Sequence, residues 1–247
     1  MTRTLVLALL TLSPVAFAED AAETAKKLDA LYAQRNDPAQ LKELEKATEA
    51  ALAAFPNDYG ILWRASRLKY WEADGATHEK IKAKLGRESW ELGERAVKVN
   101  SKGVEGHYYA GIGLGAYSQG VGVLTALSEG LEGKFNAHVD AAVKMNPAYD
   151  NAGPLIAKGR YWYELPWPKR DLEKSKETLK KAIQTQPAAL RAWLYLAETQ
   201  LKDGDAKAAK ASIDKVLAGA ESYDPPEARR VKARAKSVAE AIARELD

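Results

Sequence analysis

The sequence predicts an all-α fold: a solenoid of stacked helical hairpins with insertions and a C-terminal capping helix. Three observations favour this class. One segment near the C-terminus has the full pattern of a helix-turn-helix unit, and a short motif recurs at intervals of 34 to 46 residues. Elsewhere, apolar residues recur at the spacing of amphipathic helices. Because one helix pair cannot bury its own apolar face, such pairs are expected to stack into a continuous core.

The clearest unit is the segment 187–217, which reads as two amphipathic helices joined by a turn. Trp193, Leu196 and Ala197 give the first helix its apolar stripe, and Gly204 lies in the turn. The apolar positions expected to be buried in the second helix are Ala209, Ile213, Val216 and Leu217. This order of residues resembles a tetratricopeptide repeat and implies a tetratricopeptide-like solenoid.

Copies of the repeat differ in length. An alanine followed by an aliphatic residue recurs at positions 51, 96, 142 and 182, and Val216 closes the series. The steps are 45, 46, 40 and 34 residues, so only the last has the tetratricopeptide length. The extra residues are expected, as loops or lengthened helices, at 72–82, 120–133 and 166–169.

The first 18 residues are expected to be a cleaved signal peptide. Arg3 precedes a short apolar run at 5–12, and Ala16-Phe17-Ala18 has the small-x-small pattern of a cleavage site. The run is too short to span a bilayer, and no cysteine follows it that could carry a lipoprotein anchor. Residues 19–247 are therefore expected to form one helical repeat domain of a soluble periplasmic protein that is not integral to the membrane.

Four helices are expected before the middle of the chain, at 20–35, 38–55, 57–71 and 80–100. The motif Asn36-Asp37-Pro38 ends the first helix and begins the second. In the third helix, Trp63 and Tyr70 are seven residues apart on one face, and we interpret them as core residues rather than ligand contacts.

The capping helix is expected to begin at Asp224-Pro225-Pro226-Glu227, because prolines in the first turn need no amide donor. Its apolar face contains Val231, Ala235, Val238 and Ile242. The opposite face is basic, and we interpret it as solvated: Arg229, Arg230, Lys232, Arg234 and Lys236.

Residues 103–133 contain nine of the seventeen glycines, and no Asp, Glu, Lys or Arg occurs from 106 to 128. Each glycine costs a helix about 1 kcal/mol relative to alanine, so a compensating role is expected. Gly111 and Gly115 are expected to let another helix approach closely. The glycines expected in turns of an inserted loop are Gly120, Gly122, Gly130 and Gly133. The alternative is that this uncharged stretch lines a pocket or a pore.

The segment 159–170 combines aromatic residues with prolines, and Pro166 and Pro168 fix Trp167 in a turn. With the glycine-rich stretch it can form an aromatic pocket whose charged group is Arg160. Packing between consecutive repeats is the alternative. The candidate ligand-binding residues are His107, Tyr108, Tyr117, Arg160, Trp162 and Trp167.

The remaining patterns exclude several function classes. His78, His107 and His138 lack metal-ligand spacing, and there is no cysteine, so we expect no metal, catalytic or cofactor site and no enzyme. The dinucleotide-like motif at 111–116 lies in a helical context that does not fit that fingerprint. After removal of the signal peptide, 36 basic and 34 acidic residues remain, which argues against nucleic-acid binding.

Two families resemble the chain. The tetratricopeptide-like domain of the regulator of microtubule dynamics family is similar over about 61–201, in the motifs at 62–67, 94–100, 107–110, 142–147 and 159–170. The stretch 159–166 and the export signal are similar to the T-component proteins associated with bacterial TRAP transporters. This second resemblance implies a periplasmic oligomer with a cavity through each subunit that pairs with a substrate-binding component. Export excludes the microtubule role.

The leading interpretation is an exported, non-catalytic binding or scaffold protein. In its preferred form it is a transporter-accessory component that holds a small ligand between the glycine-rich stretch and the segment 160–167. The alternative is a structural interaction module that binds a peptide or a protein partner in its concave groove.

Overall fold

Antiparallel helices stacked side by side make up the computed structural model, which describes residues 20–246. The expected signal peptide lies outside the described residues. The helices are α1 (Ala21–Tyr32), α2 (Pro38–Ala54), α3 (Tyr59–Gly75), α4 (Glu79–Val99), α5 (Val104–Val121), α6 (Val123–Ser128), α7 (Leu131–Met145), α8 (Tyr149–Glu164), α9 (Leu172–Thr185), α10 (Leu190–Lys202), α11 (Ala206–Ala218) and α12 (Pro225–Leu246).

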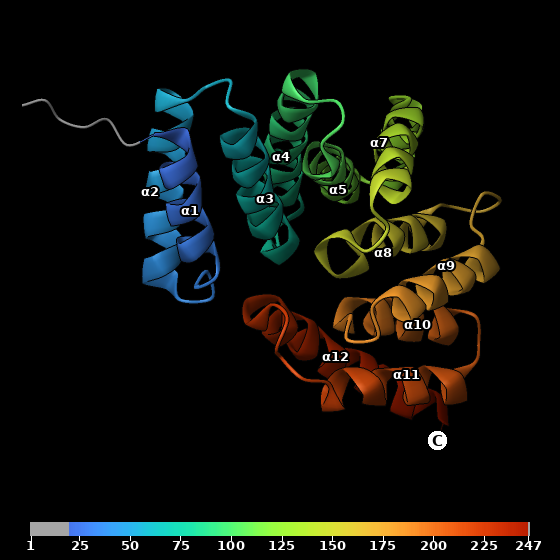
Figure 1. Cartoon of the computed structure of the whole chain (residues 1–247). Helices are drawn as coiled ribbons and strands as arrows, with labels where there is room; N and C mark the ends of the chain where they lie inside the picture. The colour runs from blue at the N-terminus through green and yellow to red at the C-terminus, as the bar shows by residue number, and fades with distance from the viewer. Residues whose placement is uncertain (1–19, 247) are drawn as a thin grey trace, which may run out of the picture.

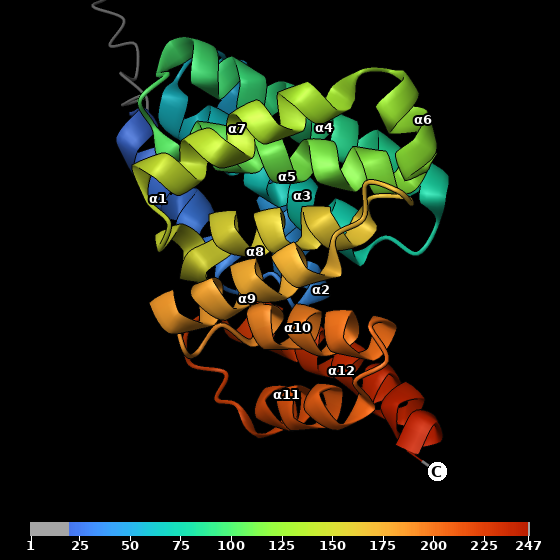
Figure 2. The same ribbon diagram turned by 90° about the vertical axis from the view of Figure 1, so that its right-hand side faces the viewer.

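The stack curves back on itself. In Figure 1, α1 and α2 lie at one end and α11 and α12 at the other, yet the first turns of α12 lie next to the end of α3. Figure 2 shows the same curvature from the side, with α8 to α12 layered below α3 to α7. At the point of closure, a guanidinium nitrogen of Arg230 donates to the carbonyl oxygen of Trp71 at 2.8 Å.

The chain starts many of its helices with capping residues. The carboxylate of an aspartate just before the helix accepts a hydrogen bond from a first-turn amide at Asp20, Asp37, Asp58, Asp171, Asp205 and Asp224. Such caps satisfy backbone donors that have no partner within the helix and each contribute about 1 kcal/mol.

In the segment 187–217, where a repeat is expected, the chain forms the helices α10 and α11. Leu196, Ala197 and Ile213 are buried as predicted. The prediction for Leu217 is wrong, because this side chain is 40 % exposed. Val216 occupies the inward position of the last turn, and the next residue along a helix lies about 100° further round.

The helices α4 and α5 pack with their backbones in contact, and glycines make this possible. A Cβ atom on Gly93 would lie 2.5 Å from the backbone nitrogen of Ala110, and one on Gly120 would lie 2.4 Å from that of Ala83. Gly113 meets α4 in the same way, at 2.6 Å from the backbone nitrogen of Trp90. The predicted turn at Gly120 is therefore wrong: this residue belongs to a helix that presses against its neighbour.

Of four other predictions for glycines, three are confirmed and one is wrong. A close helix approach is confirmed at Gly111, where a Cβ would lie 2.8 Å from a methyl group of Val139 on α7. Turns are confirmed at Gly122 and Gly130, whose φ angles of 91° and 71° favour glycine. Gly133 lies inside α7 and not in a turn, so the expected loop consists largely of the short helix α6.

Candidate functional site

A cavity of about 130 Å³ lies on the inner side of the curved stack. Residues from α3, α5, α6, α7, α8 and α10 line it, so segments distant in sequence contribute to one site. One side of the cavity is apolar and the other carries charged side chains.

The apolar side comes from α5, α6 and α7. Ile112 and Phe135 face the cavity from α5 and α7, and Val123 and Leu127 face it from α6. Gly115 leaves room for the ring of Phe135, because a Cβ at this position would lie 3.4 Å from the ring. The glycine-rich stretch thus supplies both the close contact with α4 and an uncharged cavity wall.

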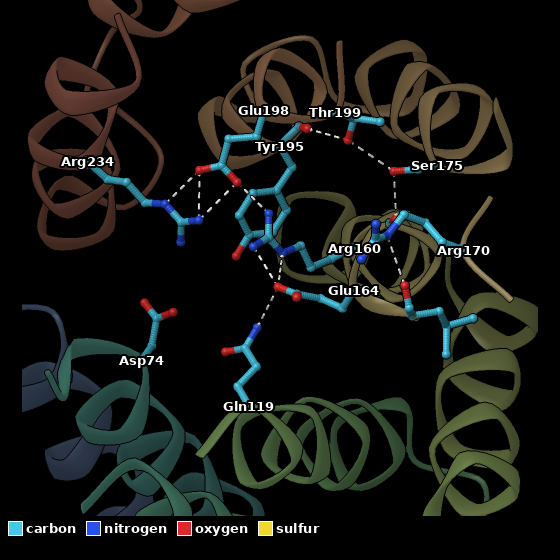
Figure 3. A network of polar contacts seen from close by, with 12 residues as sticks. Asp74, Gln119, Arg160, Glu164, Arg170, Ser175, Tyr195, Glu198, Thr199 and Arg234 are labelled. Carbon is cyan, nitrogen blue, oxygen red and sulfur yellow. Dashed lines mark hydrogen bonds and ion pairs between the residues drawn. The ribbon is translucent and has the colours of Figure 1, made fainter. Parts of the chain in front are cut away.

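Arg160 of α8 is the central group of the polar side (Figure 3). Its guanidinium binds the carboxylate of Glu164, one turn further along the helix, at 2.6 and 2.7 Å. It also binds Glu198 of α10 and stacks on the ring of Tyr195 at 4.6 Å. Burial alone would lower the pKa of Arg160, but Tyr195, Glu164 and Glu198 outweigh it and raise the pKa above its ordinary value. Arg160 is therefore a permanent cation.

Glu198 is buried and is held from two sides. In addition to Arg160, Arg234 of α12 donates to its two carboxylate oxygens at 2.7 and 2.9 Å (Figure 3). Ser175 and Thr199 join the same layer of helices, because their hydroxyl oxygens are 3.1 Å apart and Ser175 donates to the carbonyl oxygen of Gly159 at 2.9 Å. The polar side is thus fixed by α8, α9, α10 and α12 together.

Asp74 of α3 closes the polar side from the N-terminal half. Two guanidinium nitrogens of Arg191 donate to its carboxylate at 3.0 and 3.1 Å, and Arg230 approaches at 3.3 Å. Burial alone would raise the pKa of Asp74, but Arg191 and then Arg230 outweigh it and hold the pKa below its ordinary value. Arg191 also binds Glu227 at 2.9 Å. These contacts join α3 to α10 and α12 across the cavity.

The prediction of a solvated basic face on the last helix is wrong for Arg230, whereas Arg234 remains 44 % exposed although it forms an ion pair. Arg230 lies with its guanidinium carbon 3.2 Å from the ring centre of Trp71, and Arg234 binds Glu198. The cause is the curvature of the stack, which turns this face of α12 toward α3 and α10 (Figure 1).

Two of the six candidate ligand-binding residues line the cavity. Tyr108 and Arg160 do so from α5 and α8. Tyr117 instead lies between α4 and α6, where its hydroxyl bonds with Arg87 at 2.6 Å and with Glu129 at 3.1 Å. Trp162 packs edge-on against Tyr161 outside the cavity. Trp167 is 85 % exposed, since its flanking prolines hold it in a loop that leaves the stack.

His107, the remaining candidate, faces away from the cavity toward His138 of α7. Their Nδ1 atoms are 3.2 Å apart, and Nε2 of His138 lies 3.0 Å from the carboxylate of Glu94. Within residues 20–246, no group of three or more histidine or acidic side chains is arranged to hold a metal ion.

The sequence patterns did not identify Asp74, Arg191, Glu164 or Tyr195 as site residues. Glu164 follows Arg160 by four residues, which is the spacing of an ion pair on a helix surface. This pair could therefore have been predicted from the sequence. Asp74 and Arg191 are 117 residues apart and meet only because the stack curves.

The chain is similar to one protein family and to the solved structures of two proteins described below. The family model described as Regulator of microtubule dynamics protein 1-3 matches residues 24–170. Among solved structures, a thermophilic TPR protein of Thermus thermophilus is similar, with 19 % identity, a TM-score of 0.66, and coverage of 89 % of this chain and 98 % of that one. Yeast Tom70 matches with 14 % identity and a TM-score of 0.34, over 89 % of this chain and 55 % of that one. No curated protein matches the chain.

The likeness to the Thermus protein confirms the tetratricopeptide-like fold. None of the helices in residues 20–246 combines the length and the apolar composition that crossing a membrane requires.

Proposed function

The chain belongs to the regulator of microtubule dynamics protein 1-3 family, and we propose that it is a non-catalytic binding module whose cavity holds a small amphipathic ligand. The two-sided lining of the cavity carries this proposal. An apolar wall from α5 to α7 faces a charged wall from α3, α8 and α10, so the site matches a molecule with an apolar body and a polar end.

The apolar body of the ligand would lie against Ile112, Leu127 and Phe135. Its transfer from water to this preformed apolar surface would favour binding. The polar end would face Arg160 and Gln119. Gln119, which lines the cavity, donates a hydrogen bond of 3.2 Å to Glu164 (Figure 3), and a ligand acceptor can replace this bond at small cost.

A binding role accounts for the charged wall better than catalysis does. The charged groups Arg160, Asp74 and Arg191 are engaged in ion pairs that raise or lower their pKa values in the direction that keeps them ionised. A general acid or base needs a pKa near the working pH, whereas the pKa values of these three groups are shifted away from neutral pH.

Two glycine positions allow a direct test. Gly115 borders the cavity and faces only the ring of Phe135, so Gly115→Leu fills the cavity from the α5 wall. Gly133 is also helical, has open space around it and lies outside the cavity, so Gly133→Leu is the matched control. Binding of anilinonaphthalene sulfonate, followed by fluorescence, should weaken at least about tenfold in the first variant and stay unchanged in the second. Equal binding by both would remove the cavity as the ligand site.

We further propose that the protein is exported and acts as an accessory component of a transporter. Residues 1–18 have the composition of a signal peptide, and 159–166 are similar to the TRAP transporter T components. Such a component would present its ligand to a substrate-binding partner and would assemble as a homo-oligomer. The microtubule role in the family's name is not part of this proposal, because an exported chain does not meet microtubules.

Export has its own test. Protein produced from the full sequence in a bacterial host should appear in the periplasmic fraction, and its N-terminal sequence should begin at Glu19. Full-length protein confined to the cytoplasm would contradict export without affecting the ligand proposal.

A second candidate function follows from the tetratricopeptide-like fold itself. A curved helical stack presents a concave surface that can bind a peptide or a protein. Cross-linking of a purified partner to α3, α8 or α12, with Gly115→Leu leaving its affinity unchanged, would favour this function over the small-ligand one.

A further inference from the structure

The pair His107 and His138 joins three helices through a continuous set of hydrogen bonds. The Nδ1 atoms face each other at 3.2 Å, with the ring centres 5.4 Å apart. On one side, Nε2 of His107 lies 3.2 Å from the carbonyl oxygen of Ser101. On the other, Nε2 of His138 lies 3.0 Å from Glu94, which also accepts from the indole nitrogen of Trp90 at 3.0 Å. The set therefore links α4, α5 and α7.

The partners of the outer nitrogens determine where protons reside. The carbonyl oxygen of Ser101 and the carboxylate of Glu94 only accept, so both Nε2 atoms must donate. The two Nδ1 atoms then hold one proton between them, donated by one ring and accepted by the other. The pair so protonated carries a single positive charge, which Glu94 balances.

Adding or removing one proton breaks this arrangement. With a second proton between the rings, two N–H groups and two positive charges face each other at 3.2 Å. With none, two lone pairs face each other. Burial lowers the pKa of His107 most and the His138 ring lowers it further; the Ser101 carbonyl and the Glu94 carboxylate oppose this, but the pKa stays below its ordinary value. The second proton is therefore taken up more readily by the unfolded chain, and acidification below the ordinary histidine range weakens the link.

Few other charged groups face the pair. From α4 there is Glu94, and from α7 there is Lys134, whose ammonium lies 5.1 Å from the ring centre of Trp90. From α8, Lys158 is paired with Asp140 of α7 at 2.7 Å, and α5 contributes His107 itself. Among the described residues, Glu94 is the carboxylate hydrogen-bonded to the rings, and it balances one of two positive charges.

The link holds a wall of the cavity. Phe135 and Leu131, one and two turns before His138 on α7, line the apolar side. The packing of Val139 against Gly111 is adjacent to the pair, so the proton-dependent contact between α7 and α5 lies within an apolar interface that also includes Ala142 and Ile112.

We propose that His107 and His138 form an acid-sensitive latch: a second proton on the pair weakens the contact of α7 with α4 and α5 and loosens the apolar wall of the cavity. The latch itself is independent of any ligand. Only its consequence, release of a bound molecule in acid, rests on the proposed function.

Hydrogen exchange of backbone amides in the ligand-free chain tests the latch. After correction for intrinsic rates, amides of α7 should exchange about tenfold faster at about pH 5 than at about pH 7.5, while those of α10 should change little. His107→Asn, which keeps a donor but removes the titrating ring, should abolish the difference. The third histidine of the chain provides the control: His78→Asn, at the start of α4, should retain it.

Equal exchange of α7 at both pH values, or the same pH response in His107→Asn, would overturn the latch. The wild-type chain gives a measurement that does not depend on the folding of a variant: ring ¹⁵N shifts should show two separate protonation steps for the pair. Two independent single-site titrations would contradict the shared proton. A latch that opens without releasing anilinonaphthalene sulfonate would refute the ligand site and leave the latch standing.

Discussion

Arg35, just after α1, binds Asp224, just before α12, with its Nη2 atom 2.5 Å from the carboxylate, although 189 residues separate the two in sequence. The guanidinium is almost completely buried and lies 3.8 Å from the ring centre of Tyr32 and 4.2 Å from that of Trp71. The two ends of the described chain are thereby fastened together. An open solenoid has free ends, and in this chain the segment after α1 instead contacts the start of α12.

Loss of the closure should destabilise the whole fold. We expect Arg35→Ala to lower the free energy of unfolding by about 2–3 kcal/mol, somewhat below the range for breaking a fully buried pair because Asp224 is partly exposed. Urea unfolding followed by circular dichroism measures this. Arg229→Ala removes an exposed pair with Glu221 and should cost less than about 0.5 kcal/mol. Similar losses in the two variants would show that the closure contributes nothing special.

Two glycines in helices should respond to alanine with opposite signs. Gly93→Ala places a methyl group 2.5 Å from the backbone of α5, which must shift, so we expect a loss of about 1–3 kcal/mol. Gly133→Ala adds a methyl group in open space and should gain about 0.5–1 kcal/mol from helix propensity. Thermal or urea unfolding of both variants tests the close contact of α4 and α5, and a gain in Gly93→Ala would refute it.

Ligand binding should distinguish Arg160 from Trp167, two of the candidate ligand-binding residues predicted from the sequence. Arg160→Gln removes the cation of the polar wall and should weaken binding of anilinonaphthalene sulfonate by about tenfold or more, since charge-assisted contacts contribute about 1.5–3 kcal/mol. Trp167→Ala should leave the affinity unchanged, because the ring is exposed outside the cavity. Circular dichroism confirms that both variants are helical. Weaker binding in Trp167→Ala would instead place the ligand near the loop at 166–170.

The pH dependence of stability should change at Asp150, at the start of α8. Burial and the nearby Glu227 raise the pKa of this carboxyl to about 6, so the folded state holds its proton more tightly than the unfolded chain. Ionisation therefore destabilises the fold as the pH rises through that value. Asp150→Asn should be more stable than wild type at about pH 7.5 and equal to it near pH 4, where the wild-type carboxyl is largely neutral when folded. Asp214→Asn, at an exposed position, is the control variant for loss of one carboxylate.

The fold could be predicted to a large extent because the buried face of a helix depends on the spacing of apolar residues within a short stretch of sequence. The stripe in 187–217 identified the repeat, and the proline and aspartate positions identified the starts of α2 and α12. The insertion was harder, because glycine fits both a turn and a close helix contact. A signal was nevertheless present: Gly106, Gly113 and Gly120 recur every seven residues, which places them on one face of a helix.

The site could be predicted only in part, because local patterns do not encode the curvature of the stack. Tyr108 and Arg160 belong to helix faces that turn inward. Trp167 lies in a segment rich in aromatic residues and prolines, yet its side chain is exposed in a loop outside the stack. Asp74 and Arg191 meet through the superhelical path of about a hundred intervening residues, which depends on the lengths of all the insertions between them.

The short helix α6 lies between two glycines with positive φ, and its inward side supplies Val123 and Leu127 to the cavity. Part of the cavity wall therefore belongs to a short segment outside the stacked hairpins. Replacement of these six residues would change the size and shape of the cavity while the stacked hairpins stay as they are.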